Sequence, residues 1–264
     1  MKTVSVLGCG WFGMPLARRL VADGHTVLGS TTDPAKLPEI RKAGARAFTV
    51  RIEPERPPEA GEFFRSDVVV VNFPPERRDD IAPRLAGQTE TLVRALEAGG
   101  AEFVVFISST SVYADLGRVV TEDDFLEGTP SKQSGIALRA MEQTLATADF
   151  DLTVLRFAGL IGYDRDPHRF LKKRAAASRP DTPVNLIHRD DCVEITARII
   201  KDDIRGETFN AVCDGHPLRS EFYRREAEAA GTEAPAFEKA GNWKIISGEK
   251  LKKALNYRYQ KGPV

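Results

Sequence analysis

The sequence has 264 residues, and its 38 lysine and arginine residues are balanced by 38 aspartate and glutamate residues. This length suffices for a sizeable core, and zero net charge offers no basic surface for nucleic acid. No apolar run approaches the roughly 20 residues that span a bilayer. Three cysteines without C-x-x-C spacing favour reduced thiols over disulfides or a zinc site. We therefore expect a cytoplasmic protein that binds neither nucleic acid, nor membrane, nor metal.

A glycine-rich turn near the N-terminus carries the strongest functional signal. A predicted strand runs into G-x-G-x-x-G, and a predicted amphipathic helix follows directly. Gly8 permits the tight turn, Gly10 lets backbone amides approach a pyrophosphate, and Gly13 allows the helix to pack on the strand. This context favours a dinucleotide site over a glycine turn without a ligand. Trp11 and Phe12 belong to the expected cofactor loop, although their rings are better suited to packing beneath it.

Cys9 lies inside the same loop. A helix N-terminus can lower the pKa of a nearby thiol and make it reactive. A small residue that simply fits a tight turn is the favoured interpretation here.

The end of the second predicted strand, residues 26–29, indicates the type of cofactor. In NAD sites an acidic residue about 20 positions after the glycines holds the ribose 2′-hydroxyl. Asp33 is the only nearby carboxylate, and as an N-cap before a proline it is engaged with the backbone. The segment instead offers hydroxyl and cationic side chains, namely Ser30, Thr31, Thr32, Lys36 and Arg41. We predict NADP(H) in preference to NAD(H).

Strands and helices alternate through residues 1–158. Further strands are predicted at 47–50, 67–73, 103–107 and 152–156, with helices at 80–98 and 131–147. The apolar run of the fourth strand is typical of a strand buried on both faces. Phe73 and Pro74, at its end, are expected beside the cofactor. The alternation predicts a Rossmann-type, doubly wound parallel sheet that forms a dinucleotide-binding domain.

Beyond residue 158 the pattern becomes less regular. Residues 159–264 are predicted to form a smaller α/β region on the substrate side. The turn-rich segment 159–167 follows a strand end, which is where ligands lie in open α/β sheets. Residues 184–200 are expected to return to the Rossmann sheet as a strand and a helix, with two aspartates at the helix start.

The order of these motifs resembles the extended short-chain dehydrogenases/reductases, the NAD-dependent epimerase/dehydratase-like superfamily. The resemblance covers nearly the whole chain. Besides the glycine loop, four segments carry it: ISSTSVY at 107–113, LRFAG at 155–159, NLIHRDD at 185–191, and residues 246–257. The G-x-G-x-x-G spacing resembles the atypical branch of the family. The resemblance implies a nicotinamide dinucleotide and a small or nucleotide-linked substrate.

The resemblance also locates the expected catalytic groups. It places the family's serine or threonine at Ser109, its tyrosine at Ser134 and its lysine at Leu138, so the tyrosine and lysine are both absent. An alkyl hydroxyl is a far weaker acid than a phenol and cannot replace it in proton transfer. Ser109 and Tyr163 are the candidate catalytic residues. Ser109 could equally cap the turn that follows it, and for Tyr163 a substrate-binding or packing role is favoured over proton transfer. Binding or structural roles are also favoured for the other polar residues, namely Tyr113, Asp164, His168 and His188.

Two functions remain open from the sequence. The first is an atypical NAD(P)-dependent oxidoreductase or epimerase/dehydratase-like enzyme with a small-molecule substrate. The second is a non-catalytic NAD(P)-binding regulator or sensor. The enzyme is favoured because the loop after the sixth strand keeps several polar groups. A homodimer is compatible with either function.

Overall fold

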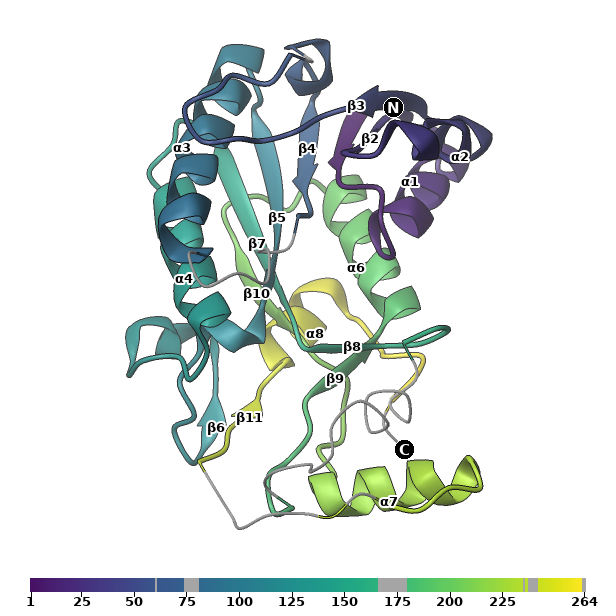
Figure 1. The fold of residues 1–264 in the computed structure, drawn as a ribbon, viewed down its shortest axis with the longest axis vertical. Coiled ribbons are helices and arrows are strands. Elements are labelled where there is room, and N and C mark those ends of the chain that lie inside the picture. The colour runs from purple at the N-terminus through teal and green to yellow at the C-terminus, as the bar shows by residue number, and fades with distance from the viewer. Residues whose placement is uncertain (60, 74–80, 166–179, 235, 237–241, 263–264) are drawn as a thin grey trace. The chain divides into compact units, whose positions relative to one another are not determined.

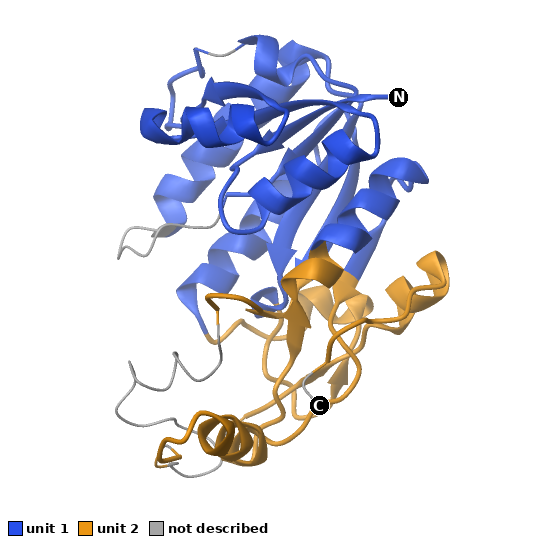
Figure 2. Cartoon of the chain, turned by 90° about the vertical axis from the view of Figure 1, so that its right-hand side faces the viewer, with its two compact units in different colours: residues 1–112, 132–156, 193–209 blue, residues 113–131, 157–192, 210–264 orange. Residues whose placement is uncertain are grey.

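The computed structural model describes residues 1–59, 61–73, 81–165, 180–234, 236 and 242–262. The chain forms two compact units, each built from several segments (Figure 2). Unit 1 consists of Met1–Val112, Lys132–Arg156 and Val193–Phe209. Unit 2 consists of Tyr113–Ser131, Phe157–Cys192 and Asn210–Val264.

A seven-stranded parallel sheet confirms the predicted Rossmann-type fold (Figure 1). Its strands are β1 (Thr3–Leu7), β2 (Thr26–Thr31), β3 (Arg46–Thr49), β4 (Val68–Val71), β5 (Phe103–Ser109), β7 (Asp151–Phe157) and β10 (Thr208–Ala211). Their order in the sheet is β10-β7-β5-β4-β1-β2-β3. The order reverses beside β1, and in open α/β sheets ligands bind at such a switch point.

Strand β4 shows why the sheet centre is stable. Its four residues are all valine, and all are completely buried. Val68 pairs with Val4 of β1 on one side and with Phe103 of β5 on the other. The expected burial of this strand on both faces is confirmed, since β-branched side chains pack well on both surfaces of a covered parallel sheet.

Helices cover both faces of the sheet. They are α1 (Gly13–Ala22), α2 (Leu37–Lys42), α3 (Ile81–Gly99), α4 (Gln133–Leu145) and α6 (Arg189–Lys201). Figure 1 shows α3 and α4 along one face, with α1 and α6 on the other. Helix α1 buries Leu16, Ala17 and Leu20, which the helical period places on one side. No helix in the described part of the chain is both long and apolar enough to cross a membrane.

The predicted return of residues 184–200 to the main sheet is corrected in part. Strand β9 (Leu186–His188) pairs with β8 (Gly159–Ile161) in a separate two-stranded sheet. The edge strand beside β7 is instead β10, and α6 begins at Arg189. A short apolar segment can pair with any free strand edge. Its sequence pattern therefore does not predict which strand lies beside it. Unit 2 also contains β6 (Val119–Val120), β11 (Ile245–Ile246), α7 (Arg219–Ala229) and α8 (Glu249–Leu255).

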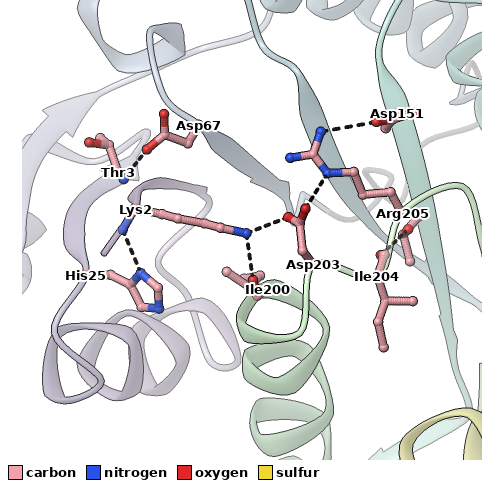
Figure 3. Close-up of polar contacts among 10 residues, drawn as sticks. Lys2, Thr3, His25, Asp67, Asp151, Ile200, Asp203, Ile204 and Arg205 are labelled. Carbon is pink, nitrogen blue, oxygen red and sulfur yellow. Dashed lines mark hydrogen bonds and ion pairs between the residues drawn. The ribbon is translucent and has the colours of Figure 1, made fainter.

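A polar network ties the amino-terminal ends of the strands to the end of α6 (Figure 3). The Lys2 ammonium donates to the Ile200 carbonyl oxygen at 3.0 Å and to the Asp203 carboxylate. Arg205 bonds to Asp203 and to Asp151, the first residue of β7, each at 3.1 Å. The lysine thus caps the carbonyls of the last turn of α6, where a cation is favoured.

A buried ion pair holds α4 against β5 and β7. The Arg156 guanidinium donates to the Glu142 carboxylate at 2.7 Å, and both side chains are only 4% exposed. The Ser108 hydroxyl donates to the same carboxylate. The charge and its hydrogen-bonding capacity are therefore satisfied inside the protein.

We predict that Glu142→Ala lowers the free energy of unfolding by about 3–5 kcal/mol, because it leaves the Arg156 charge buried and unpaired. Glu62→Ala is the control, since its ion pair with Arg46 is exposed and should contribute under about 1 kcal/mol. Urea unfolding followed by circular dichroism measures both. Equal small losses for the two variants would contradict the interpretation.

Candidate functional site

The turn between β1 and α1 requires two of its glycines for steric reasons. Gly8 has φ +101°, and a Cβ there would lie 2.1 Å from the Asn72 carbonyl oxygen. A Cβ on Gly13 would lie 2.1 Å from the Gly8 carbonyl oxygen. The backbones of β1, β4 and α1 therefore approach one another more closely than any side chain allows.

Gly10 has a different role. It is exposed, and a Cβ there would meet no atom within 4 Å. Helix α1, which starts three residues later, has no side-chain cap among the described residues and no acidic residue in its first turn. The positive end of the helix dipole lies at this open side of the loop, so the loop fits a pyrophosphate group.

The three other loop residues differ in accessibility. Trp11 is half-buried, whereas Phe12 is buried, so its ring packs beneath the loop and does not lie open to a cofactor. Cys9 is also buried, and its thiol donates to the Val6 carbonyl oxygen at 3.7 Å. Burial raises the pKa of the Cys9 thiol to about 12. Cys9 is a packing residue, and the helix N-terminus does not activate it.

The structure corrects the predicted role of Ser30 as part of a 2′-phosphate site. Its side chain is 1% exposed, and its hydroxyl accepts a hydrogen bond from the Gly8 amide at 3.1 Å. Its carbonyl oxygen accepts from the Cys9 amide at 2.7 Å. Consecutive residues of a strand face opposite sides, so Ser30 supports the glycine turn from within while Thr31 has the opposite orientation.

The other residues predicted for the 2′-phosphate site lie at the end of β2 and in the segment that follows it. The Thr31 hydroxyl accepts from the Asp33 amide at 3.1 Å, and the Asp33 carboxylate accepts from the Ala35 amide at 3.0 Å. The predicted N-cap role of Asp33 is confirmed, and the following turn is a 3-10 helix at Pro34–Lys36. Thr32 and Lys36 are exposed.

The sequence analysis missed two residues at this end of the sheet. The Asn72 side-chain amide donates to the Gly8 carbonyl oxygen at 2.9 Å. The Arg51 guanidinium donates to the Thr32 carbonyl oxygen at 2.7 Å. Asn72 directly follows β4, and Arg51 lies two residues after β3. A position just past a strand end was a usable signal for each, because parallel strands finish at the same edge. Phe73, next to Asn72, is half-buried, and Pro74 lies outside the described residues.

Ser109 ends β5 in a half-buried position, and its hydroxyl accepts from the Ser111 amide at 3.2 Å. Ser134 is half-buried in the first turn of α4. Leu138, where the resemblance implies a lysine, is 6% exposed. The lysine position is therefore filled by an apolar side chain packed in unit 1.

Tyr163 lies in a charged cluster of unit 2. It is 60% exposed with φ +57°, and its phenol donates to the Asp190 carboxylate at 2.9 Å. The Arg189 guanidinium lies 3.7 Å from the ring centre, which is a cation–π contact. The Lys261 ammonium also bonds to Asp190, at 3.0 Å. Burial raises the pKa of Asp190, but the hydrogen bonds from Lys261 and Tyr163 outweigh it, and the net shift is downward.

The adjacent residues support the fold of unit 2. Asp191 is buried and accepts from the Tyr257 phenol at 2.7 Å and from the Gln260 amide at 2.9 Å. His188 accepts from the Asp190 amide, and burial lowers the pKa of its imidazole. The Tyr113 phenol is buried against Asn210 at 2.8 Å. His168 lies outside the described residues.

Known proteins and a family model match this chain at the sequence level. The model of a family described as NAD(P)H-binding matches residues 8–203. "Protein YeeZ" of Escherichia coli (strain K12) is 32% identical over 269 aligned residues, covering 98% of this chain and 96% of that protein.

Solved structures match the fold over almost the whole chain. UDP-glucuronic acid 4-epimerase from Bacillus cereus in complex with NAD has a TM-score of 0.80 at 18% identity, with coverage of 99% of this chain and 94% of that chain. A functionally unknown conserved protein from Silicibacter pomeroyi has a TM-score of 0.75 at 22% identity, with the same coverage. The likeness confirms the predicted fold.

We predict that the cysteines are unreactive in the folded protein. All three are buried, and burial raises the pKa of each thiol, so the nucleophilic thiolate is scarce at neutral pH. Iodoacetamide labelling followed by intact-mass measurement should give no adduct before unfolding and three adducts in urea. Stoichiometric labelling of Cys9 in the folded protein would contradict the structural assignment.

We predict that Gly10→Ala and Gly13→Ala fail in different ways. In Gly10→Ala the methyl group extends into open space, so the free energy of unfolding changes by under about 1 kcal/mol. The same methyl group blocks the pyrophosphate, and calorimetry should show at least about tenfold weaker NADP⁺ binding, or roughly 1.4 kcal/mol. Gly13→Ala should lose about 1–3 kcal/mol or more of stability through overpacking. Unchanged NADP⁺ binding by Gly10→Ala would contradict the site.

Proposed function

The chain belongs to the NAD(P)H-binding family. From this premise we propose that it is an atypical member of the epimerase/dehydratase-like superfamily and an NADP(H)-dependent oxidoreductase or epimerase/dehydratase-like enzyme. The observation that carries the proposal is the loop at Gly10, which is open to solvent and followed by a helix start without a side-chain cap. The fold shared with an NAD-bound UDP-glucuronic acid 4-epimerase supports a small or nucleotide-linked substrate.

The preference for NADP(H) rests on the end of β2. Thr31 and Thr32 stand where an NAD site has a carboxylate, and Lys36 follows on an exposed turn. Asp33 does not compete for the ribose, because its carboxylate caps the Ala35 amide. Hydroxyl and ammonium groups favour a phosphate over a hydroxyl at this place.

The bound nicotinamide supplies hydride transfer, and the chain supplies binding and proton handling. The loop amides hold the pyrophosphate, while Asn72 and Ser30 fix the turn that presents them. The Ser109 oxygen accepts from a backbone amide, which leaves its own proton available to a carbonyl or hydroxyl group. We propose Tyr163 as a second catalytic residue, because its phenol donates a hydrogen bond to the Asp190 carboxylate.

A specific observation favours a second candidate function, a non-catalytic NAD(P)-binding regulator or sensor. Ser134 and the buried Leu138 replace the family's acid–base pair. A protein that binds the cofactor but lacks the acid–base pair is suited to sense the cofactor and not to turn it over.

The deciding experiment combines calorimetry with turnover assays. NADP⁺ and NAD⁺ are titrated first, and a panel of small carbonyl compounds and nucleotide sugars follows. Cofactor absorbance detects redox turnover, and chromatography detects isomerised products. Turnover supports the enzyme, while tight binding without turnover, together with a specific protein partner, supports the regulator. NAD⁺ binding tenfold tighter than NADP⁺, about 1.4 kcal/mol, would overturn the NADP(H) preference.

We predict that Ser134→Ala changes turnover by under about threefold, because an alkyl hydroxyl contributes no useful proton transfer near neutral pH. Ser109→Ala is the matched substitution, and loss of a positioned donor should lower turnover by about 10²-fold. Both variants are assayed with the substrate found above, with NADP⁺ affinity measured in parallel. A loss of about 10²-fold or more in Ser134→Ala, within the range for an acid–base group, would make Ser134 a chemically active residue.

A further inference from the structure

The chain beyond β3 runs beside the end of β2. Thr31 pairs with Thr49 in the parallel register, and the Val50 amide donates to the Thr31 carbonyl oxygen at 3.1 Å. Val50 and Ile52 are both buried, and Arg51 between them is exposed. Alternation along an extended chain therefore turns the Arg51 side chain outward while its neighbours anchor the backbone.

One hydrogen bond holds the Arg51 side chain at the end of β2, and a second holds the backbone of the next residue. The Arg51 Nη2 group donates to the Thr32 carbonyl oxygen at 2.7 Å. The Ile52 carbonyl oxygen accepts from the Gln88 side-chain amide at 2.8 Å. A guanidinium has five N–H donors in a planar fork, so this bond leaves most of its donors available.

The charge of Arg51 is not neutralised in the way that its neighbours' charges are. Arg46 pairs with Glu62 at 2.7 Å, and Arg56 pairs with Glu59 at 2.8 Å. Within the described ranges, Arg51 forms no ion pair with a carboxylate. An exposed cation held in one geometry without a counter-charge is suited to bind an anion.

A cavity of about 270 Å³ lies beside Arg51. Its lining residues are Thr49, Arg51, Glu53, Arg56, Pro57, Pro58 and Glu59. Arg56 forms ion pairs with both glutamates, so Arg51 is the lining arginine that has no carboxylate partner among the described residues. The Arg51 guanidinium and the Thr49 hydroxyl can donate to a phosphate group placed here.

We propose that Arg51 is a specificity-determining residue that binds the 2′-phosphate of NADP(H), with Thr32 and Lys36 completing the subsite. The inference rests on the proposed function, because it presumes a dinucleotide on the glycine loop. The Thr32 carbonyl holds the guanidinium in place before the ligand arrives, which reduces the entropy lost on binding. NAD(H) has a hydroxyl in place of this phosphate and makes no charge-assisted contact with Arg51.

The test compares two arginines associated with the same strand. Calorimetry measures NADP⁺, NAD⁺ and 2′,5′-ADP binding to the full chain, to Arg51→Gln and to Arg46→Gln. Arg51→Gln should bind NADP⁺ and 2′,5′-ADP at least about tenfold more weakly, as expected for a hydrogen bond to a charged group. Its NAD⁺ affinity should change by under about twofold, because the lost contact is specific to the phosphate. Arg46→Gln removes the same charge at the opposite end of β3 and should change none of the three affinities.

The outcomes separate this inference from the proposed function. If the wild type binds neither dinucleotide, the proposed function fails. If the wild type prefers NADP⁺ and Arg51→Gln keeps that preference, the assignment of Arg51 alone is overturned. Equal losses for NADP⁺ and NAD⁺ in Arg51→Gln would also overturn it, because they would indicate a structural role through Thr32. Thermal unfolding of each variant, with Arg51→Lys as a charge-preserving substitution, excludes loss of folding as the cause.

Discussion

The carbonyl oxygen of Gly8 lies where three parts of the fold meet. The Asn72 side chain donates to it from the end of β4, and the Gly13 backbone of α1 lies against it with no room for a methyl group. The Gly8 amide is bonded to the Ser30 hydroxyl of β2. The buried polar groups of the turn thus have partners within the protein. Because strands on both sides hold it, the turn has one geometry before any ligand binds.

Helix α4, on which the resemblance places a catalytic tyrosine and lysine, is packed against the sheet although both residues are absent. Glu142 and Leu138 are four residues apart on α4 and share one face. Glu142 is fixed by Arg156 and Ser108, so this face is held against the sheet independently of residues 134 and 138. A buried leucine needs no polar partner there, whereas a lysine would need a partner or a ligand. The structural and chemical roles of the helix are therefore separable.

Features that depend on neighbours in sequence were predictable, and features that depend on strand pairing were not. Six strands of the main sheet, the glycine turn and the Asp33 cap follow from local pattern and capping chemistry, whereas β10 was expected in the smaller region. Arg51 lies 19 residues from Thr32, and only the register of β2 with β3 brings them together. The error at Ser30 came from treating three consecutive hydroxyl residues alike, although alternate residues of a strand face opposite sides.

The residues proposed to recognise the cofactor and the charged cluster around Tyr163 come from different parts of the chain. The glycine loop, Asn72, Thr32 and Arg51 all belong to Met1–Val112, the first segment of unit 1. The cluster in unit 2 instead joins the turn at Tyr163, the start of α6 and the Lys261 segment near the C-terminus. The proposed cofactor residues are thus held by contacts within one continuous segment of unit 1, such as the one between Asn72 and Gly8. Changes in the polar groups of unit 2 would leave these contacts in place.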